Sequence, residues 1–165
     1  MNDIKVAIVD DHQLFRRSLT HFVNDNKGMH VAIEAANGQQ LLDQLEKTPV
    51  DVVLLDIEMP VMNGYETSEH LSEKYPEIKI LIISQLTSRE SIHRMMDVGA
   101  QGYFTKSSNP EQLEHAIRHV HEKGFYFGVE LAAVIKEAFN WQKSEPGITE
   151  IDIKEDYFNP VKEHF

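Results

Sequence analysis

Four short, largely apolar runs in this chain each end in a polar side chain. The runs cover residues 6–9, 52–55, 80–83 and 102–105, and the polar residues that follow them are Asp10 with Asp11, Asp56, Ser84 and Lys106. Runs of this length are typical of buried strands in a parallel sheet. Ligands of such sheets bind outside the carboxyl ends of the strands. We therefore expect three carboxylates, a hydroxyl and an ammonium group to converge at one chemical site.

Strand and helix patterns alternate along the chain as far as residue 122. We predict strands near residues 4–9, 29–35, 51–55, 78–83 and 101–104, with helices between them. The last of these helices has a typical start, Asn109 before Pro110. Its apolar face follows helical spacing at Leu113, Ala116, Ile117 and Val120. Five strands that alternate with helices indicate an α/β doubly wound sheet with right-handed crossovers.

The pattern changes after Gly124. Residues 125–128 (Phe-Tyr-Phe-Gly) indicate an aromatic turn, and residues 128–142 have the apolar spacing of a further helix. Residues 144–147 predict a break, and the stretch that follows is too short to form a core of its own. We therefore expect a main domain over residues 1–124, a linker helix over 125–143 and a C-terminal tail over 144–165.

Composition and charge exclude several classes of protein. The chain has no cysteine, so disulfides and thiolate metal sites are excluded. Its formal net charge is −11, and Arg16-Arg17 is its only pair of adjacent basic residues, so we expect no direct binding of nucleic acid by this chain. No apolar run is long enough to span a bilayer, and no signal peptide is visible after Met1. We expect a cytoplasmic protein that does not bind membranes.

The residue types at the expected site indicate phosphoryl chemistry. Three carboxylates at one point repel one another unless a cation is present, and Mg²⁺ prefers oxygen ligands of this kind. Asp56 stands alone at the end of its strand, which makes it the candidate nucleophile, because carboxylates can attack phosphorus to form an aspartyl phosphate. Lys106 and Ser84 could then stabilise the transferred group by charge and by a hydrogen bond.

Histidines offer a weaker metal hypothesis. His115 and His119 are four residues apart on a predicted helix, and His121 is nearby. This spacing can bind zinc, but no third ligand is indicated, and we expect these histidines to form a solvated helix face.

The ordered set of site residues resembles the receiver domain of two-component response regulators. The resemblance covers residues 4 to about 122 and is carried by Asp10-Asp11, by Asp56 with Met59-Pro60 and Gly64 after it, by Ser84 and by Lys106. Residues 10–16, 56–60 and 99–103 are similar to the NarL/LuxR subgroup in particular. The resemblance implies a flavodoxin-like (βα)5 fold with strand order 2-1-3-4-5, followed by a linker helix and a tail.

The resemblance also implies a role for each site residue. Asp56 would be the phosphoacceptor and Lys106 would pair with the phosphoryl oxygens. Ser84 and Tyr103 would be the hydroxyl and the aromatic side chain that move on activation. The Mg²⁺ ligands would be Asp11 and Asp56 directly, Asp10 through water, and Glu58 through its main-chain carbonyl. Such a protein catalyses only its own phosphorylation and dephosphorylation, and is not otherwise an enzyme.

The implied partner is a sensor histidine kinase, with a possible homodimer after phosphorylation. The subgroup normally continues into a helix-turn-helix, and residues 148–153 resemble at most the start of that domain, so the tail would be a remnant of a truncated output domain. The chain could therefore be the N-terminal part of a DNA-binding LuxR-type transcriptional regulator. Two further alternatives are a Mg²⁺-dependent phosphohydrolase with an aspartyl nucleophile, and an interaction module with a vestigial site.

Overall fold

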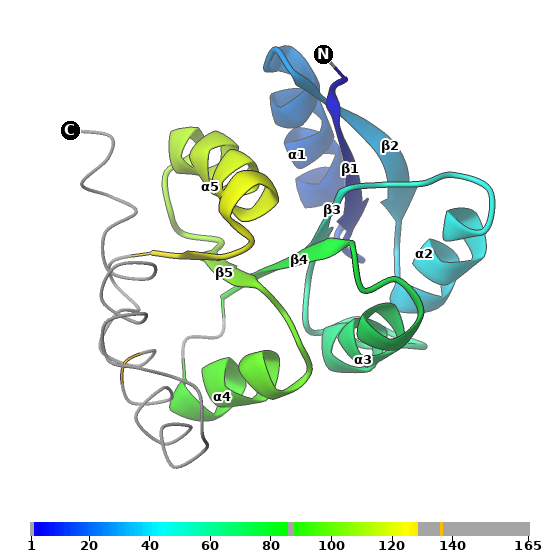
Figure 1. The fold of residues 1–165 in the computed structure, drawn as a ribbon, viewed down its shortest axis with the longest axis vertical. Coiled ribbons are helices and arrows are strands. Elements are labelled where there is room, and N and C mark those ends of the chain that lie inside the picture. The colour runs from blue at the N-terminus through cyan, green and yellow to red at the C-terminus, as the bar shows by residue number, and fades with distance from the viewer. Residues whose placement is uncertain (1, 86–87, 129–135, 137–165) are drawn as a thin grey trace.

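The computed structural model describes residues 2–85, 88–128 and 136 of the chain (Figure 1). Its centre is a parallel sheet with strand order β2-β1-β3-β4-β5-β6. The elements, in chain order, are β1 (Ile4–Val9), α1 (Gln13–Asp25), β2 (Met29–Ala35), α2 (Gly38–Leu45), β3 (Val52–Leu55), α3 (Gly64–Lys74), β4 (Lys79–Ser84), α4 (Arg89–Asp97), β5 (Gly102–Thr105), α5 (Pro110–Lys123) and β6 (Tyr126–Phe127). The predicted α/β fold and the order of the first five strands are confirmed.

Helices cover both faces of this sheet, which explains why its central strands β3, β4 and β5 are largely apolar. Figure 1 shows α1 and α5 on one side and α2, α3 and α4 on the other. Successive side chains of a strand point to opposite faces. Ala7 and Val9 accordingly belong to the core that includes Leu41 of α2, whereas Val6 and Ile8 belong to the core on the other face.

The connection from β2 to β3 creates the reversal point of the sheet. The chain forms β1 and β2, then passes back so that β3 pairs with the other side of β1. Val9 at the end of β1 lies in register with Leu55 at the end of β3, and the backbone N–H of Asp56 donates to the carbonyl oxygen of Val9 at 3.0 Å. Helices leave to opposite sides at such a point, which opens a crevice at the carboxyl ends of the two strands.

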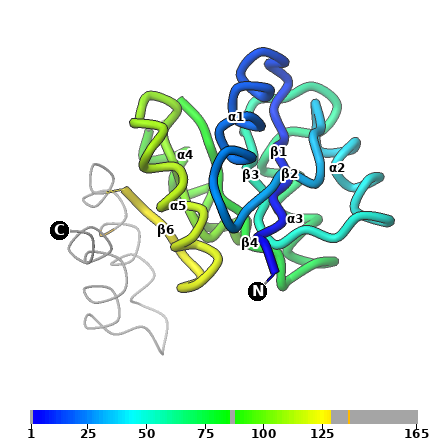
Figure 2. Tube along the Cα trace, turned by 90° about the horizontal axis from the view of Figure 1, so that it is seen from above, coloured from blue at the N-terminus to red at the C-terminus, as the bar shows by residue number. Residues whose placement is uncertain are grey.

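The expected aromatic turn at residues 125–128 is wrong, because Tyr126 and Phe127 form β6, a strand of the main sheet (Figure 2). Tyr126 is in register with Gly102 of β5, and the N–H of Tyr126 donates to the carbonyl oxygen of Gln101 at 3.0 Å. A Cβ on Gly102 would lie 2.8 Å from the carbonyl oxygen of Tyr126, so the glycine permits this close approach. The sheet therefore extends beyond residue 124, where we expected the main domain to end.

The expectation of a solvated histidine face is also wrong for His119. This side chain is buried, and its Nδ1 lies 2.7 Å from the carbonyl oxygen of Phe125. Its ring makes edge contacts with His115, Phe125 and Tyr126. His119 therefore links helix α5 to Phe125, the residue before β6. His121 is exposed, as expected.

Predictions for the C-terminal part of the chain lie outside the described residues, except at Lys136. These are the linker helix after residue 128 and the tail over 144–165. Among the helices that the structure describes, none combines the length and the apolar character that crossing a membrane requires.

Val61, in the loop between β3 and α3, has a backbone conformation that is strained for its residue type. Its φ is +70°, and its side chain is 80% exposed. The N–H of Met62 donates to the carbonyl oxygen of Pro60 at 2.7 Å, so Val61 is at the centre of a γ-turn with positive φ, which is a strained turn. β-branched residues adopt such left-handed φ values least readily. Because the side chain is exposed, it gains little packing energy that would offset this backbone strain.

We therefore expect the substitution Val61→Asn to stabilise the fold by about 1 kcal/mol, since asparagine tolerates this region. Urea denaturation would measure the free energy of unfolding. Val61→Ala is the matched control, because it removes the branch but keeps most of the left-handed penalty. A destabilised Val61→Asn protein would contradict the strain argument.

Candidate functional site

The carboxylates expected at the ends of β1 and β3 do lie together. Single ligand atoms of Asp10, Asp11, Asp56 and the adjacent His12 all fall within 4.8 Å of one another. Asp10 and Asp56 are buried, whereas Asp11 and His12 are exposed. The group therefore offers buried acidic groups next to a solvent-facing acid and an imidazole, at the reversal point of the sheet.

Asp10 is held in place through both its carboxylate and its carbonyl. Its Oδ1 accepts a hydrogen bond from the N–H of His12 at 2.8 Å, and its Oδ2 lies 3.0 Å from Nζ of Lys106. Its carbonyl oxygen accepts from Nη1 of Arg16 at 2.7 Å, and the same guanidinium has Nε 3.4 Å from Oε1 of Glu34. Helix α1 and strand β2 thus fix the orientation of the acidic pair.

Asp56 is a buried carboxylate with one polar partner on each oxygen. Oδ1 accepts from the N–H of Ile57 at 2.8 Å, and Oδ2 accepts from Nζ of Lys106 at 3.4 Å. Burial, and next the negative charge of Asp10, raise the pKa of Asp56 from 3.8 to about 6, although Lys106 acts in the opposite direction. A further cation at this point would favour the ionised form that a nucleophile needs.

Lys106 joins the two buried acids. It follows β5, its N–H donates to the carbonyl oxygen of Ser84 at 3.0 Å, and its ammonium group reaches both Asp10 and Asp56. Burial by itself would lower the pKa of Lys106, but the hydrogen bond to Asp10 and the charges of both carboxylates outweigh it and raise this pKa. The ammonium also lies 4.6 Å from the centre of the Phe15 ring, so a cation–π interaction further stabilises its position.

The remaining predicted residues surround an open cavity of about 550 Å³. Ser84, at the end of β4, and Glu58, on the loop after β3, line it together with Asp11, His12, Phe15, Asp56, Gln85 and Lys106. Tyr103 is fully buried in β5, the strand that pairs with β4. Burial raises the pKa of Tyr103 to about 12, while the nearby Ser84 hydroxyl acts to lower it, although the geometry gives the Tyr103 hydroxyl no hydrogen bond among the described residues. The two expected switch residues are therefore neighbours.

Sequence reasoning did not assign a role to His12, Phe15 or Arg16. His12 directly follows the acidic pair, which is a local signal that could have indicated its proximity. Phe15 and Arg16 lie one helical turn after the acidic pair, on helix α1. The packing of α1 brings Phe15 next to Lys106 and Arg16 next to the carbonyl oxygen of Asp10. These contacts depend on the folded structure, so the sequence alone does not show them.

The donor set fits a hard divalent cation. Three carboxylates from Asp10, Asp11 and Asp56 meet one ammonium group, so the cluster carries an excess of negative charge when all are ionised. Mg²⁺ takes oxygen ligands and keeps several waters. The exposed side of the cluster, at Asp11, opens onto the cavity and leaves space for such water.

Comparisons with known proteins agree with this arrangement. Residues 6–118 match the model of the response regulator receiver domain. The chain is 34% identical over 129 residues to the response regulator GacA of Pseudomonas aeruginosa, covering 78% of this chain and 60% of that protein. It is 32% identical over 125 residues to the transcriptional regulatory protein DegU of Brevibacillus brevis, covering 76% of this chain and 53% of that protein.

Solved structures show the same fold. A LuxR-family two-component response regulator from Aurantimonas has a TM-score of 0.76 at 26% identity, with 87% of this chain and all of that chain covered. The chemotaxis response regulator CheY4 of Vibrio cholerae has a TM-score of 0.66 at 33% identity, with 72% of this chain and 99% of that chain covered. The chain spans only 53% and 60% of the lengths of DegU and GacA.

The raised pKa of Asp56 predicts a pH-dependent gain in stability for Asp56→Asn. The carboxyl binds its proton more tightly in the folded state, so its ionisation destabilises the fold as the pH rises from about 4 to above 6. We expect Asp56→Asn to stabilise the protein by about 1–3 kcal/mol at pH 8 and to lose this advantage near pH 4.

Urea denaturation at both pH values, without divalent cations, would measure this difference. Asp43→Asn on helix α2 is the control for removing an exposed carboxylate, and the difference between the two variants isolates the effect of the buried group. An Asp56→Asn protein that is equally stabilised at both pH values would contradict the assigned pKa.

Proposed function

The chain belongs to the family of response regulator receiver domains of two-component signalling, and we propose that its Asp56 accepts a phosphoryl group from a histidine kinase. The observation that carries this proposal is the pairing of Lys106 with a buried Asp56 beside Asp10 and Asp11. In this arrangement a candidate nucleophile, an ammonium group and candidate metal ligands lie together at one edge of the sheet, which supports the proposal.

In the proposed reaction, an oxygen of Asp56 forms a bond to phosphorus while the bond from phosphorus to the phosphohistidine nitrogen breaks. The imidazole of the kinase leaves with the electron pair of that bond and takes up a proton. Asp56 Oδ1 is already held by the N–H of Ile57, so Oδ2 is the oxygen that we assign as the nucleophile. The ammonium of Lys106 then transfers its hydrogen bond from Oδ2 to a phosphoryl oxygen, where negative charge develops.

We assign the metal site to Asp10, Asp11 and Asp56, with the main-chain carbonyl of Glu58 as the fourth protein group. Bound Mg²⁺ would neutralise charge on the phosphoryl oxygens in transfer. Asp10 has both oxygens engaged by His12 and Lys106, which supports an indirect role through water. Asp11 is exposed and is the better candidate for direct contact.

The same geometry supports a switch. A phosphoryl group adds a charge of roughly −1.5 to −2 and three acceptor oxygens. Ser84 and Asp56 line the same cavity, and Tyr103 is buried in β5, the strand that pairs with β4. Movement of the Ser84 hydroxyl toward the phosphoryl group would change the surroundings of Tyr103, and we propose that this change alters a protein–protein interface.

The output of this switch is a proposal drawn from the relatives. DegU carries the name of a transcriptional regulatory protein, and this chain spans about half its length. A role as the N-terminal part of a DNA-binding regulator, with homodimerisation on phosphorylation, is the corresponding function here. The division into a receiver that includes β6, a linker helix after residue 128 and a tail or output-domain remnant over 144–165 belongs to this proposal.

A general phosphohydrolase is disfavoured by the position of the nucleophile. Such enzymes usually have two aspartates separated by one residue after the first strand, whereas Asp10 and Asp11 are adjacent and the nucleophile candidate follows β3. The intact acidic cluster with its lysine likewise disfavours a vestigial site.

Phosphorylation by a small donor tests the assignment of Asp56. Incubation with Mg²⁺ and acetyl phosphate should add the mass of one phosphoryl group to the intact protein, and Asp56→Asn should gain none. Lys106→Met should slow the reaction by about 100-fold, because a charged donor to the developing oxyanion is lost. A mass gain that persists in Asp56→Asn would place the acceptor elsewhere.

Leu14 tests the kinase as the donor. This side chain lies in the first turn of α1, beside the cavity residue Phe15, and is 83% exposed. A partner that reaches Asp56 past Phe15 would bury this exposed apolar side chain. We expect Leu14→Asp to slow transfer from the cognate kinase about tenfold while the rate with acetyl phosphate is unchanged. Equal slowing with both donors would show damage to the site itself.

A further inference from the structure

Helix α4 is anchored to the sheet by few side chains. Of its residues, only Ile92 and Met95 are buried, and it follows the loop that begins directly after Ser84. An element with few buried apolar contacts lies at the low-stability end of a fold and is displaced at low cost. The contacts that α4 makes with α3 therefore have a large influence on its position.

The C-terminal end of α4 is fitted closely to α3. Ser72 of α3 donates its hydroxyl to the carbonyl oxygen of Val98 at 3.1 Å. Gly99 has a φ of +89°, and a Cβ there would lie 2.5 Å from Oγ of Ser72. The backbone at this end of α4 therefore lies so close to the Ser72 side chain that only glycine fits at position 99.

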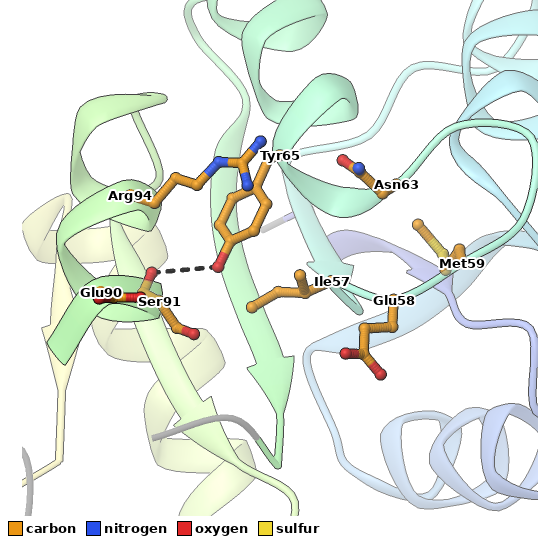
Figure 3. A pocket seen from close by; sticks show the side chains of 8 residues that line it. All are labelled: Ile57, Glu58, Met59, Asn63, Tyr65, Glu90, Ser91 and Arg94. Carbon is orange, nitrogen blue, oxygen red and sulfur yellow. Dashed lines mark hydrogen bonds between the residues drawn. The ribbon is translucent and has the colours of Figure 1, made fainter. Parts of the chain in front are cut away.

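A different contact holds the N-terminal half of α4. Tyr65, in the first turn of α3, donates its hydroxyl to the carbonyl oxygen of Ser91 at 3.3 Å, as Figure 3 shows. Arg94, in the last turn of α4, adds to this contact, with its guanidinium 4.2 Å from the centre of the Tyr65 ring. Tyr65 is buried and Arg94 is exposed. We call this set, Tyr65 with the Ser91 carbonyl and the Arg94 guanidinium, the α3–α4 latch.

The latch crosses an open pocket that leads toward the phosphoacceptor. The pocket has a volume of about 510 Å³ and lies between the loop after β3 and the start of α4; its lining residues are Ile57, Glu58, Met59, Asn63, Tyr65, Glu90, Ser91 and Arg94 (Figure 3). Ile57 donates to Asp56, and Glu58 also lines the cavity of the acidic site. The N-terminal half of α4 thus has unfilled space beside it, and Tyr65 spans that space.

Tyr65 also shares a hydrophobic core with the second expected switch residue. Tyr65 and Tyr103 are both buried in the core cluster that includes Ile92 and Met95 of α4. The latch therefore borders the acceptor loop and packs in the same core as Tyr103.

We propose that the α3–α4 latch holds the N-terminal half of α4 in the arrangement in which Lys106 pairs with Asp10 and Asp56, and that it opposes the movement of α4 when Asp56 is phosphorylated. The C-terminal contact of Ser72 with Val98 would act as the pivot. The regulatory half of this proposal rests on the proposed function of Asp56, whereas the mechanical half does not.

Hydrogen exchange tests the mechanical half without any phosphoryl donor. Tyr65→Phe removes the hydroxyl and keeps the ring, and Arg94→Met removes the cation and keeps the stem. We expect α4 amides to exchange about fivefold faster in Tyr65→Phe and about threefold faster in Arg94→Met. Lys74→Met is the matched control, because Lys74 lies 5.6 Å from the ring of Tyr75 and removing it eliminates a cation on α3 away from α4. Unchanged α4 exchange in both variants would overturn the latch.

Binding of beryllofluoride with Mg²⁺, a phosphoryl analogue, tests the regulatory half. If the latch opposes activation, both variants should bind the analogue about two- to fivefold more tightly than the wild type, because linkage is reciprocal. Faster exchange with unchanged or weaker affinity would make the latch a structural brace and overturn its regulatory role.

A wild-type protein that does not bind beryllofluoride would refute the proposed function of Asp56 and, with it, the regulatory half. The exchange measurement would still decide the mechanical half, so the two failures are distinguishable.

Discussion

One ammonium group organises the site of this receiver domain. Lys106 follows β5, and β4 separates β5 from the strand that carries Asp56, so its long side chain passes across the end of β4 to reach two carboxylates at 3.0 and 3.4 Å. Without this cation, Asp10 and Asp56 would be buried like charges with no compensation. The position of the β5–α5 loop, the packing of Phe15 and the ionisation of Asp56 all depend on where this ammonium group lies.

The sheet supplies the rigidity that this concentration of charge requires. The ends of β1 and β3 are in register, and both strands are covered by helices on each face. Backbone hydrogen bonds therefore hold the acids at a separation that their mutual repulsion would otherwise increase. The raised pKa of Asp56 reflects first its burial and second the nearby negative charge of Asp10. The proton affinity of Asp56 is therefore already higher than that of a free carboxylate, and a bound cation or a phosphoryl group would change it further.

The positions of the strands and the acidic residues could be predicted from the sequence because both depend on local signals. Apolar runs mark buried strands, and a polar residue after each run marks the same edge of the sheet. Strand β6 could not be predicted, because two residues are too few to show a period and its pairing depends on Gly102, far away in sequence. His119 was expected to be exposed because its helix spacing did not reveal that Phe125 folds back over it. The contacts of Tyr65 with Ser91 and Arg94 likewise join residues that no local pattern connects.

Strand β6 also changes what this sheet presents to other chains. A strand at the edge of a sheet exposes unpaired N–H and C=O groups, which invite the addition of a strand from another molecule and can lead to aggregation. Here the backbone of β5 is already paired with Tyr126 and Phe127, and within the described residues the edge beyond β5 is a two-residue strand. Addition of a strand from another molecule directly to β5 is therefore blocked by the chain itself. A partner that approaches β5 at these residues meets β6 first, so its contacts depend on the side chains of that short strand.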